Sequence, residues 1–334
     1  MENTKNHWRA VQLADKFARG KDYKCLFPGC ERAAVDCHAI ARSACVEALA
    51  SDGHLYTRRY SYNQVMRMND IADPPEIIRT SVNKASVFKG YCATHDAKLF
   101  SPAEIPEHRK RGGMFVALQL RAYSVEYCRL RSATDFMARV LEVSPSLREL
   151  NFYVDAVKAQ RERLRIFLRL YLNSAFKMFF GSKTDSVEYL MIPIARNLGV
   201  SCCGCFNQEV GAHDSVIAFN LISHSNYSYL VLGVFKVMEK WLTNFLDAYG
   251  GAGMWERILN DIAFHHCEEP LISCRLWEAM SAEEQMNVRL AIRHPDFRGA
   301  FQRPAVIRLV DADFPRDVTD EMRTRFPESM FDGK

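Results

Sequence analysis

Two short pairs of zinc-binding residue types constrain this chain more than any other feature of its sequence. Four residues, among them a Pro-Gly turn, separate Cys25 from Cys30, and two residues separate Cys92 from His95. Structural zinc sites usually collect four ligands as two such pairs, each bent back by a turn. The pattern predicts a zinc tetrad of Cys25, Cys30, Cys92 and His95. The alternative is a set of ordinary buried thiols with a histidine, since a long stretch of chain separates the two pairs.

The cysteine count favours metal ligation or buried thiols over disulfide bonds. The chain has 334 residues and 11 cysteines, and its first residues mix charged and apolar side chains without the apolar run of a secretory signal. Disulfide frameworks belong mainly to secreted proteins, so we expect a cytoplasmic protein. Cys202, Cys203 and Cys205 lie in a predicted strand whose neighbouring side chains point to opposite faces, and we predict buried thiols there rather than a second metal site.

Composition and motifs exclude several classes of protein. The chain is 48% hydrophobic and 25% charged, with 16 Gly and 12 Pro, which is typical of a globular protein. It contains no Walker A loop, dinucleotide fingerprint, G-x-S-x-G elbow or H-E-x-x-H helix, so nucleotide hydrolysis, hydride transfer and the common hydrolase mechanisms have no motif to support them. The longest uncharged stretch, residues 215–235, contains polar residues near its centre and predicts a β-hairpin rather than a membrane span.

The order of apolar patterns predicts an α+β protein in three parts. These are a zinc module resembling a treble clef at 1–104, a basic helical region at 105–186, and a mixed C-terminal domain at 187–334 with a small antiparallel sheet and helices. The predicted helices are 5–20, 114–143, 147–180, 237–249, 254–264 and 281–292, and the predicted strands are 187–195, 200–206, 216–222 and 227–234. Helices 114–143 and 147–180 should form a central antiparallel hairpin. Residues 53–87 and the tail from 300 onward show no regular pattern.

Positive charge is concentrated in the helical region. The net charge of the chain is +4, yet residues 105–180 hold 14 Lys and Arg against 7 Asp and Glu. An apolar face that includes Phe152 and Phe167 is predicted to pack on the core. Two sets of cations are candidates for contacts with nucleic-acid phosphates, the patch Arg109, Lys110 and Arg111, and the helix face Lys158, Arg161, Arg165 and Arg169. A solvated helix face is the alternative for the second set.

The segment Asp36-Cys37-His38 lies between the two pairs, and this layout resembles the treble-clef HNH endonucleases over roughly residues 22–104. The resemblance implies that the pairs form two zinc knuckles, that His38 is the general base, and that Asp96 is a metal ligand followed by the basic residue Lys98. In that family a single Mg²⁺ or Mn²⁺ stabilises the leaving oxygen while the histidine activates water. Cys37 stands where the family commonly has Asp or His, which leaves Asp36 as the substitute ligand, because thiolates bind magnesium poorly.

Three functions follow as hypotheses. The first is a zinc-stabilised protein that binds DNA or RNA, and the second is an HNH-like nuclease that uses His38. The third is an interaction scaffold whose helical hairpin binds a protein partner or a second copy. The role of His38 stays open between a spare zinc ligand in place of His95, a catalytic base and an ordinary histidine. The layout is also similar to bacterial proteins of unknown activity that join such a zinc module to helical and mixed domains, some of them in defence or mobile-element systems.

Overall fold

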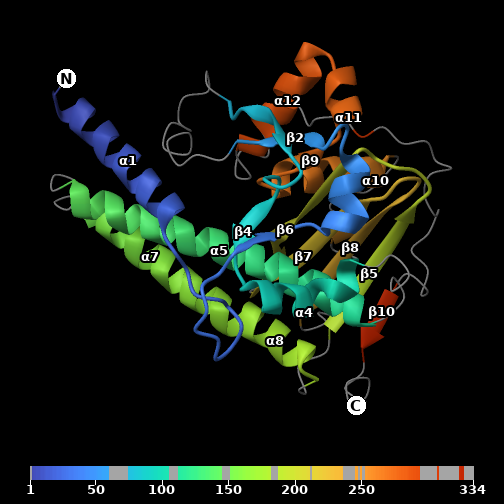
Figure 1. Cartoon of the computed structure of the whole chain (residues 1–334), viewed down its shortest axis with the longest axis horizontal. Helices are drawn as coiled ribbons and strands as arrows, with labels where there is room; N and C mark the ends of the chain where they lie inside the picture. The colour runs from blue at the N-terminus through green and yellow to red at the C-terminus, as the bar shows by residue number, and fades with distance from the viewer. Residues whose placement is uncertain are drawn as a thin grey trace.

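The structure is a computed structural model that combines a long central helix with a large antiparallel sheet (Figure 1). It describes residues 2–59, 74–104, 112–144, 151–181, 187–210, 213–235, 245–246, 249, 253–293, 307 and 323–326. The helices are α1 (Glu2–Gly20), α2 (Glu47–Leu49), α4 (Ala93–Glu104), α5 (Gly112–Val143), α7 (Asn151–Phe167), α8 (Asn173–Phe179), α10 (Met254–Asp261), α11 (Cys274–Ala279) and α12 (Ala282–Arg293). Three π-helical segments extend them, η1 (Arg42–Val46), η3 (Leu168–Leu172) and η4 (Ile262–His266).

The strands form one large sheet and one small ribbon. The large sheet has eight strands in the order β10-β5-β8-β7-β6-β9-β2-β3, with antiparallel neighbours throughout. Its strands are β2 (His54–Arg58), β3 (Ile77–Ser81), β5 (Val187–Ile194), β6 (Val200–Val210), β7 (His213–Ser223), β8 (Ser228–Phe235), β9 (Leu271–Ile272) and β10 (Arg323–Phe326). The ribbon pairs β1 (Asp36–His38) with β4 (Val87–Lys89).

Helices cover both faces of the sheet, so its central strands carry apolar side chains on both faces. Cys203 and Ala218 belong to the core cluster that includes the buried side of α5, whereas Cys202 and Ile217 belong to the cluster that includes α10 and η4. Side chains alternate between faces along a strand, and this alternation separates the neighbouring thiols. The prediction of buried thiols on opposite faces is therefore confirmed for Cys202 and Cys203, whereas Cys205 is half-buried.

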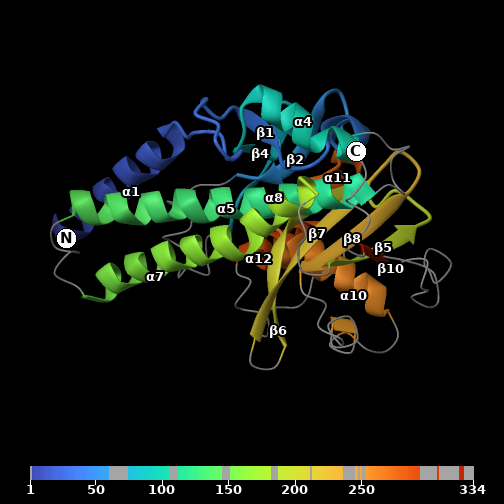
Figure 2. The same cartoon turned by 90° about the horizontal axis from the view of Figure 1, so that it is seen from below.

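The central helical hairpin is confirmed, with one correction. The 32-residue helix α5 packs against α7 and α8, and Figure 2 shows α1 and α7 on opposite sides of α5. Phe152 does not face the core, because its side chain is 68% exposed. The buried residues of α7 are Val157 and Phe167. Phe167 is therefore buried as predicted, and the correction concerns the start of the helix, where Val157 is buried and Phe152 is not.

The sheet is larger than the small sheet that the sequence predicts. The four predicted strands and the hairpin at 215–235 are present as β5 to β8. Strands β2 and β3 come from the stretch without a regular pattern, and β10 comes from the tail predicted to be irregular. Tyr56 of β2 pairs with Ile272 of β9, so strands from both ends of the chain share one sheet. The predicted helix 237–249 lies largely outside the described residues, and no described helix is long and apolar enough to cross a membrane.

Candidate metal centre

The first pair of ligands sits on a tight loop that the backbone closes. Lys24 and Ala33 form an antiparallel bridge, and the N–H of Cys25 donates to the carbonyl oxygen of Arg32 at 2.8 Å. The N–H of Cys30 donates to the carbonyl oxygen of Phe27 at 3.0 Å, and Gly29 adopts φ +76°, a conformation that other residues rarely take. The Pro-Gly turn therefore brings Cys30 back toward Cys25, as the spacing predicts.

The second pair lies at the start of α4. Cys92 precedes the helix, His95 is in its first turn, and the N–H of Asp96 donates to the carbonyl oxygen of Cys92 at 2.9 Å. The N–H of Leu26 donates to the carbonyl oxygen of Gly90 at 2.8 Å, and this bond ties the first loop to the chain that leads into α4. The two pairs are distant in sequence and adjacent in space.

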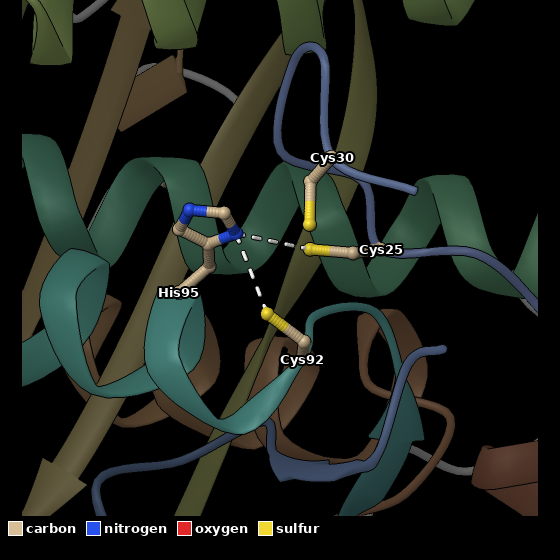
Figure 3. A group of neighbouring side chains, drawn as sticks. All are labelled: Cys25, Cys30, Cys92 and His95. Carbon is tan, nitrogen blue, oxygen red and sulfur yellow. Dashed lines mark hydrogen bonds between the residues drawn. The ribbon is translucent and has the colours of Figure 1, made fainter. Parts of the chain in front are cut away.

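The four ligand atoms converge on one point (Figure 3). They lie within 4.8 Å of one another, and Nδ1 of His95 is 3.5 Å from the sulfur of Cys25 and 3.4 Å from the sulfur of Cys92. A tetrahedral zinc with bonds of about 2.3 Å to sulfur and about 2.0 Å to nitrogen would place these atoms about 3.5 Å apart. The side chains therefore have the spacing of a Cys₃His metal site, and this group could hold an ion such as zinc.

The surroundings favour the protonation state that a metal requires at Cys30 and His95 and oppose it at Cys25. The backbone N–H of Arg32 lowers the pKa of Cys30, which favours its thiolate, while burial raises the pKa of Cys25. Burial also lowers the pKa of His95, so its imidazole stays neutral and keeps a lone pair for a metal. The ring of Phe27 stacks on the ring of His95 with centroids 3.7 Å apart and an interplanar angle of 5°. This stacking fixes the orientation of the imidazole.

His38 lies outside the tetrad. It ends β1, is half-buried, and has its Nδ1 atom 3.2 Å from the carbonyl oxygen of Ala85. Burial lowers its pKa. Within the described part of the chain, the fourth member of the converging group is His95 and not His38.

The structure does not gather the residues that the HNH resemblance implies for catalysis. Asp36 is exposed, whereas the carboxyl group of Asp96 is buried beside the thiol of Cys37, and its burial raises the pKa of Asp96. Asp36, His38 and Asp96 form no group with converging ligand atoms, and the tetrad is the one such group among the residues that the structure describes. Lys98 lies with its ammonium group 5.9 Å from the ring centre of Phe27.

The four helical cations are exposed on α7 and η3. Lys158 forms an ion pair with Asp155 at 3.0 Å, and Arg165 forms one with Glu162 at 2.8 Å. Arg161 and Arg169 form no ion pair with the described residues. The patch Arg109, Lys110 and Arg111 lies outside the described residues.

Two residues of the metal centre escaped the sequence analysis. Phe27 stacks on His95, and Arg32 donates from its side chain to Thr94 Oγ1 at 3.1 Å and stabilises the thiolate of Cys30. Phe27 lies between the first two cysteines and Arg32 follows them. An aromatic residue and a cation next to a Cys pair are therefore the sequence signal that points to these two residues.

Comparison with known protein families, with curated proteins and with solved structures finds no match to this chain.

Proposed function

We propose that this chain is a zinc-stabilised nucleic-acid-binding protein. The observation that carries the proposal is the convergence of Cys25, Cys30, Cys92 and His95 at tetrahedral spacing. Three thiolates and an imidazole suit zinc, whereas magnesium and calcium prefer oxygen ligands. Four protein ligands fill a tetrahedral ion and leave no open position for a substrate, so the role assigned to this zinc is structural.

The arrangement around the tetrad supports a module of the treble-clef type. A ligand-bearing loop is followed by the β1–β4 ribbon and then by α4, which carries the second pair of ligands at its start. A zinc ion there would join the loop to the helix and fix both against α5, which packs on α4. This small module has few other ways to close its ends, and metal binding would supply part of its folding energy.

The exposed face of α7 and η3 supports binding to a phosphate backbone. Lys158, Arg161, Arg165 and Arg169 recur every three or four residues, which places them along one side of the helix. Two of them form exposed ion pairs within their own helix, and such pairs contribute little and exchange readily for phosphate. A row of cations of this kind neutralises phosphates without reading base edges, so the expected binding depends on salt more than on sequence.

The test is binding of fluorescently labelled single- and double-stranded DNA and RNA across a range of salt concentrations. Four phosphate contacts predict a slope of about −3.6 for log K against log salt on duplex DNA. The variant Lys158→Gln/Arg161→Gln/Arg165→Gln/Arg169→Gln should lose most of that slope. A matched control removes four exposed cations elsewhere, Lys16, Arg79, Lys84 and Arg275, and should keep it. Equal losses in both variants, or binding that ignores salt, would overturn the proposal.

The same oligonucleotides decide between the other two functions. Cleavage in Mg²⁺ or Mn²⁺ that is lost in the variant His38→Ala would support the HNH-like nuclease in place of the binding function. Asp36 and Asp96 would then be the next residues to substitute. Absence of both binding and cleavage would leave the scaffold function, in which the helical hairpin binds a protein partner or a second copy.

A further inference from the structure

A second candidate site lies on the other side of α5 from α7. It is a pocket of about 190 Å³ between the end of α1, strand β4 and the middle of α5. Figure 2 shows α1 and β4 on one side of α5 and α7 on the other. The pocket is therefore separate from the cationic face of α7, and its lining includes none of the four tetrad residues.

The lining of the pocket is strongly cationic. It contains five basic side chains and one carboxylate, that of Glu269; the basic residues are Arg19, Lys21, Lys89, Arg129 and Arg131. Burial raises the pKa of Glu269, and Arg129 lies close enough to oppose that effect. A concave surface with this balance concentrates anions.

Four of the five cations already have carboxylate partners that do not line the pocket. Arg19 pairs with Asp15, Lys21 with Asp135, Lys89 with Asp22 and Arg129 with Glu268. The separations are 3.7 Å for Lys89 and 3.8 Å for Arg129, and Asp22 is 94% exposed. The exposed pair of Lys89 with Asp22 contributes little neutralising energy, so Lys89 stays available to an anion. Buried Asp15 and the carboxylates around Arg129 neutralise Arg19 and Arg129 more strongly.

Arg131 is the cation without a carboxylate partner among the described residues. Its guanidinium lies 3.8 Å from the ring centre of Tyr23, and its Nη2 donates to the carbonyl oxygen of Lys89 at 2.9 Å. Its Nε atom is buried and has no hydrogen-bond partner. The guanidinium therefore keeps a positive charge that no carboxylate among the described residues pairs with, and an anion in the pocket would balance it.

Apart from Glu269, Ser132 and the hydroxyl of Tyr23, the rest of the lining is apolar and includes a fixed aromatic ring. Ala18, Ala39, Val87, Phe88 and Val125 line it beside the cations. The ring of Phe88 packs on Gly90, where an added Cβ would come within 2.3 Å of a ring carbon. Glycine at position 90 thus lets the ring lie in this position. Cations alone would suit inorganic anions, whereas cations beside a flat apolar wall suit a phosphate attached to an aromatic base.

We propose that this pocket binds a nucleotide phosphate, carried either by a free nucleotide or by the phosphorylated end of a nucleic-acid strand. Arg131, Lys89 and Lys21 hold the phosphate, and Phe88 contacts the base. Guanidinium groups bind phosphate oxygens with paired hydrogen bonds, which gives Arg131 the main share of the binding. This inference does not depend on the cationic face of α7.

Calorimetric titration of the whole chain tests the proposal with four probes, inorganic phosphate, adenosine monophosphate, and one short oligonucleotide with and without a 5′-phosphate. The monophosphate should bind more tightly than inorganic phosphate. A phosphorylated strand that binds more tightly than both the unphosphorylated strand and the monophosphate would identify a strand end as the ligand. Equal binding of the two strands, with binding of the monophosphate, would identify a free nucleotide. No binding of any phosphate probe would overturn the proposal.

Two variants assign the binding to the pocket. Arg131→Gln and Lys89→Gln should each weaken binding of the monophosphate by about tenfold, the effect of losing one charge-assisted hydrogen bond. Lys89 is 36% exposed, so its variant should fold even if Arg131→Gln does not. Lys84→Gln removes an exposed cation outside the pocket and should leave binding unchanged. Wild-type affinity in the Lys89 variant, or equal losses in the Lys84 and Lys89 variants, would place the binding elsewhere.

Discussion

Removal of zinc should lower the stability of the whole chain by an amount that the zinc affinity of the folded tetrad sets. The two ligand pairs are about 60 residues apart in sequence and meet only in the folded chain, so the unfolded chain has no preformed site. An ion that binds only the folded state stabilises it by RT ln(1 + [Zn]/Kd), which is about 4 kcal/mol when free zinc is about a thousand times Kd. The free energy of unfolding should therefore fall by about 4 kcal/mol when a strong chelator is added at that zinc concentration.

Two single variants show whether the loss belongs to the tetrad. Cys30 is partly exposed and contributes little packing, so Cys30→Ala should be nearly as unstable in zinc as the wild type is in chelator. Cys45 is fully buried and lies outside the tetrad. Cys45→Ala should lose about 1 to 2 kcal/mol of packing and still respond to the chelator in full.

The assay is urea unfolding followed by tryptophan fluorescence, with zinc and with chelator, for the wild type and both variants. The reasoning is refuted if the chelator leaves the wild-type free energy unchanged. It is also refuted if the chelator destabilises Cys30→Ala as much as it destabilises Cys45→Ala.

Three further predictions concern stability. Burial raises the pKa of Glu126 to about 7, so the folded state holds this proton more tightly than the unfolded state does. The free energy of unfolding should therefore fall as the pH rises from about 4.5 through 7. In urea unfolding, Glu126→Gln should be up to about 3 kcal/mol more stable than the wild type at pH 8 and indistinguishable from it at pH 4. Ser281→Ala removes the hydroxyl that accepts from the N–H of Glu284 at 3.2 Å, and thermal unfolding should show a loss of about 1 kcal/mol. Gly199→Ala should lower the free energy of unfolding by at least about 1 kcal/mol in the same assay, because position 199 has φ +71° and the new methyl would lie 3.0 Å from Ser273 Oγ. An unchanged melting temperature in Ser281→Ala or in Gly199→Ala would contradict the prediction for that variant.

The sequence was most informative where a local pattern determines the structure by itself. The helix predicted over 281–292 begins with a capping box, in which the N–H of Ser281 donates to the Glu284 carboxylate at 2.8 Å. The spacing of Cys25 and Cys30 determines a loop, and the spacing of Cys92 and His95 determines one helical turn. These features need only neighbouring residues, which a sequence displays directly.

Long-range contacts account for what the sequence missed. Strand β2 has the mixed sequence HLYTR, and its place in the sheet depends on β3 and on Ile272 of β9. Phe152 and Val157 both fit a helical apolar face, and the position of α5 alone decides that Val157 is buried. The pocket beside Arg131 combines five separate segments, so no local motif could have revealed it.

X-ray absorption at the zinc edge of the purified protein, together with its metal content, reports directly on the Cys25, Cys30, Cys92 and His95 site. We expect one zinc per chain, with three sulfur ligands at about 2.3 Å and one nitrogen ligand at about 2.0 Å. His95→Ala should remove the nitrogen contribution, and His38→Ala should leave the spectrum unchanged. A protein without bound zinc, or a spectrum that changes with His38 and not with His95, would contradict the tetrad described here.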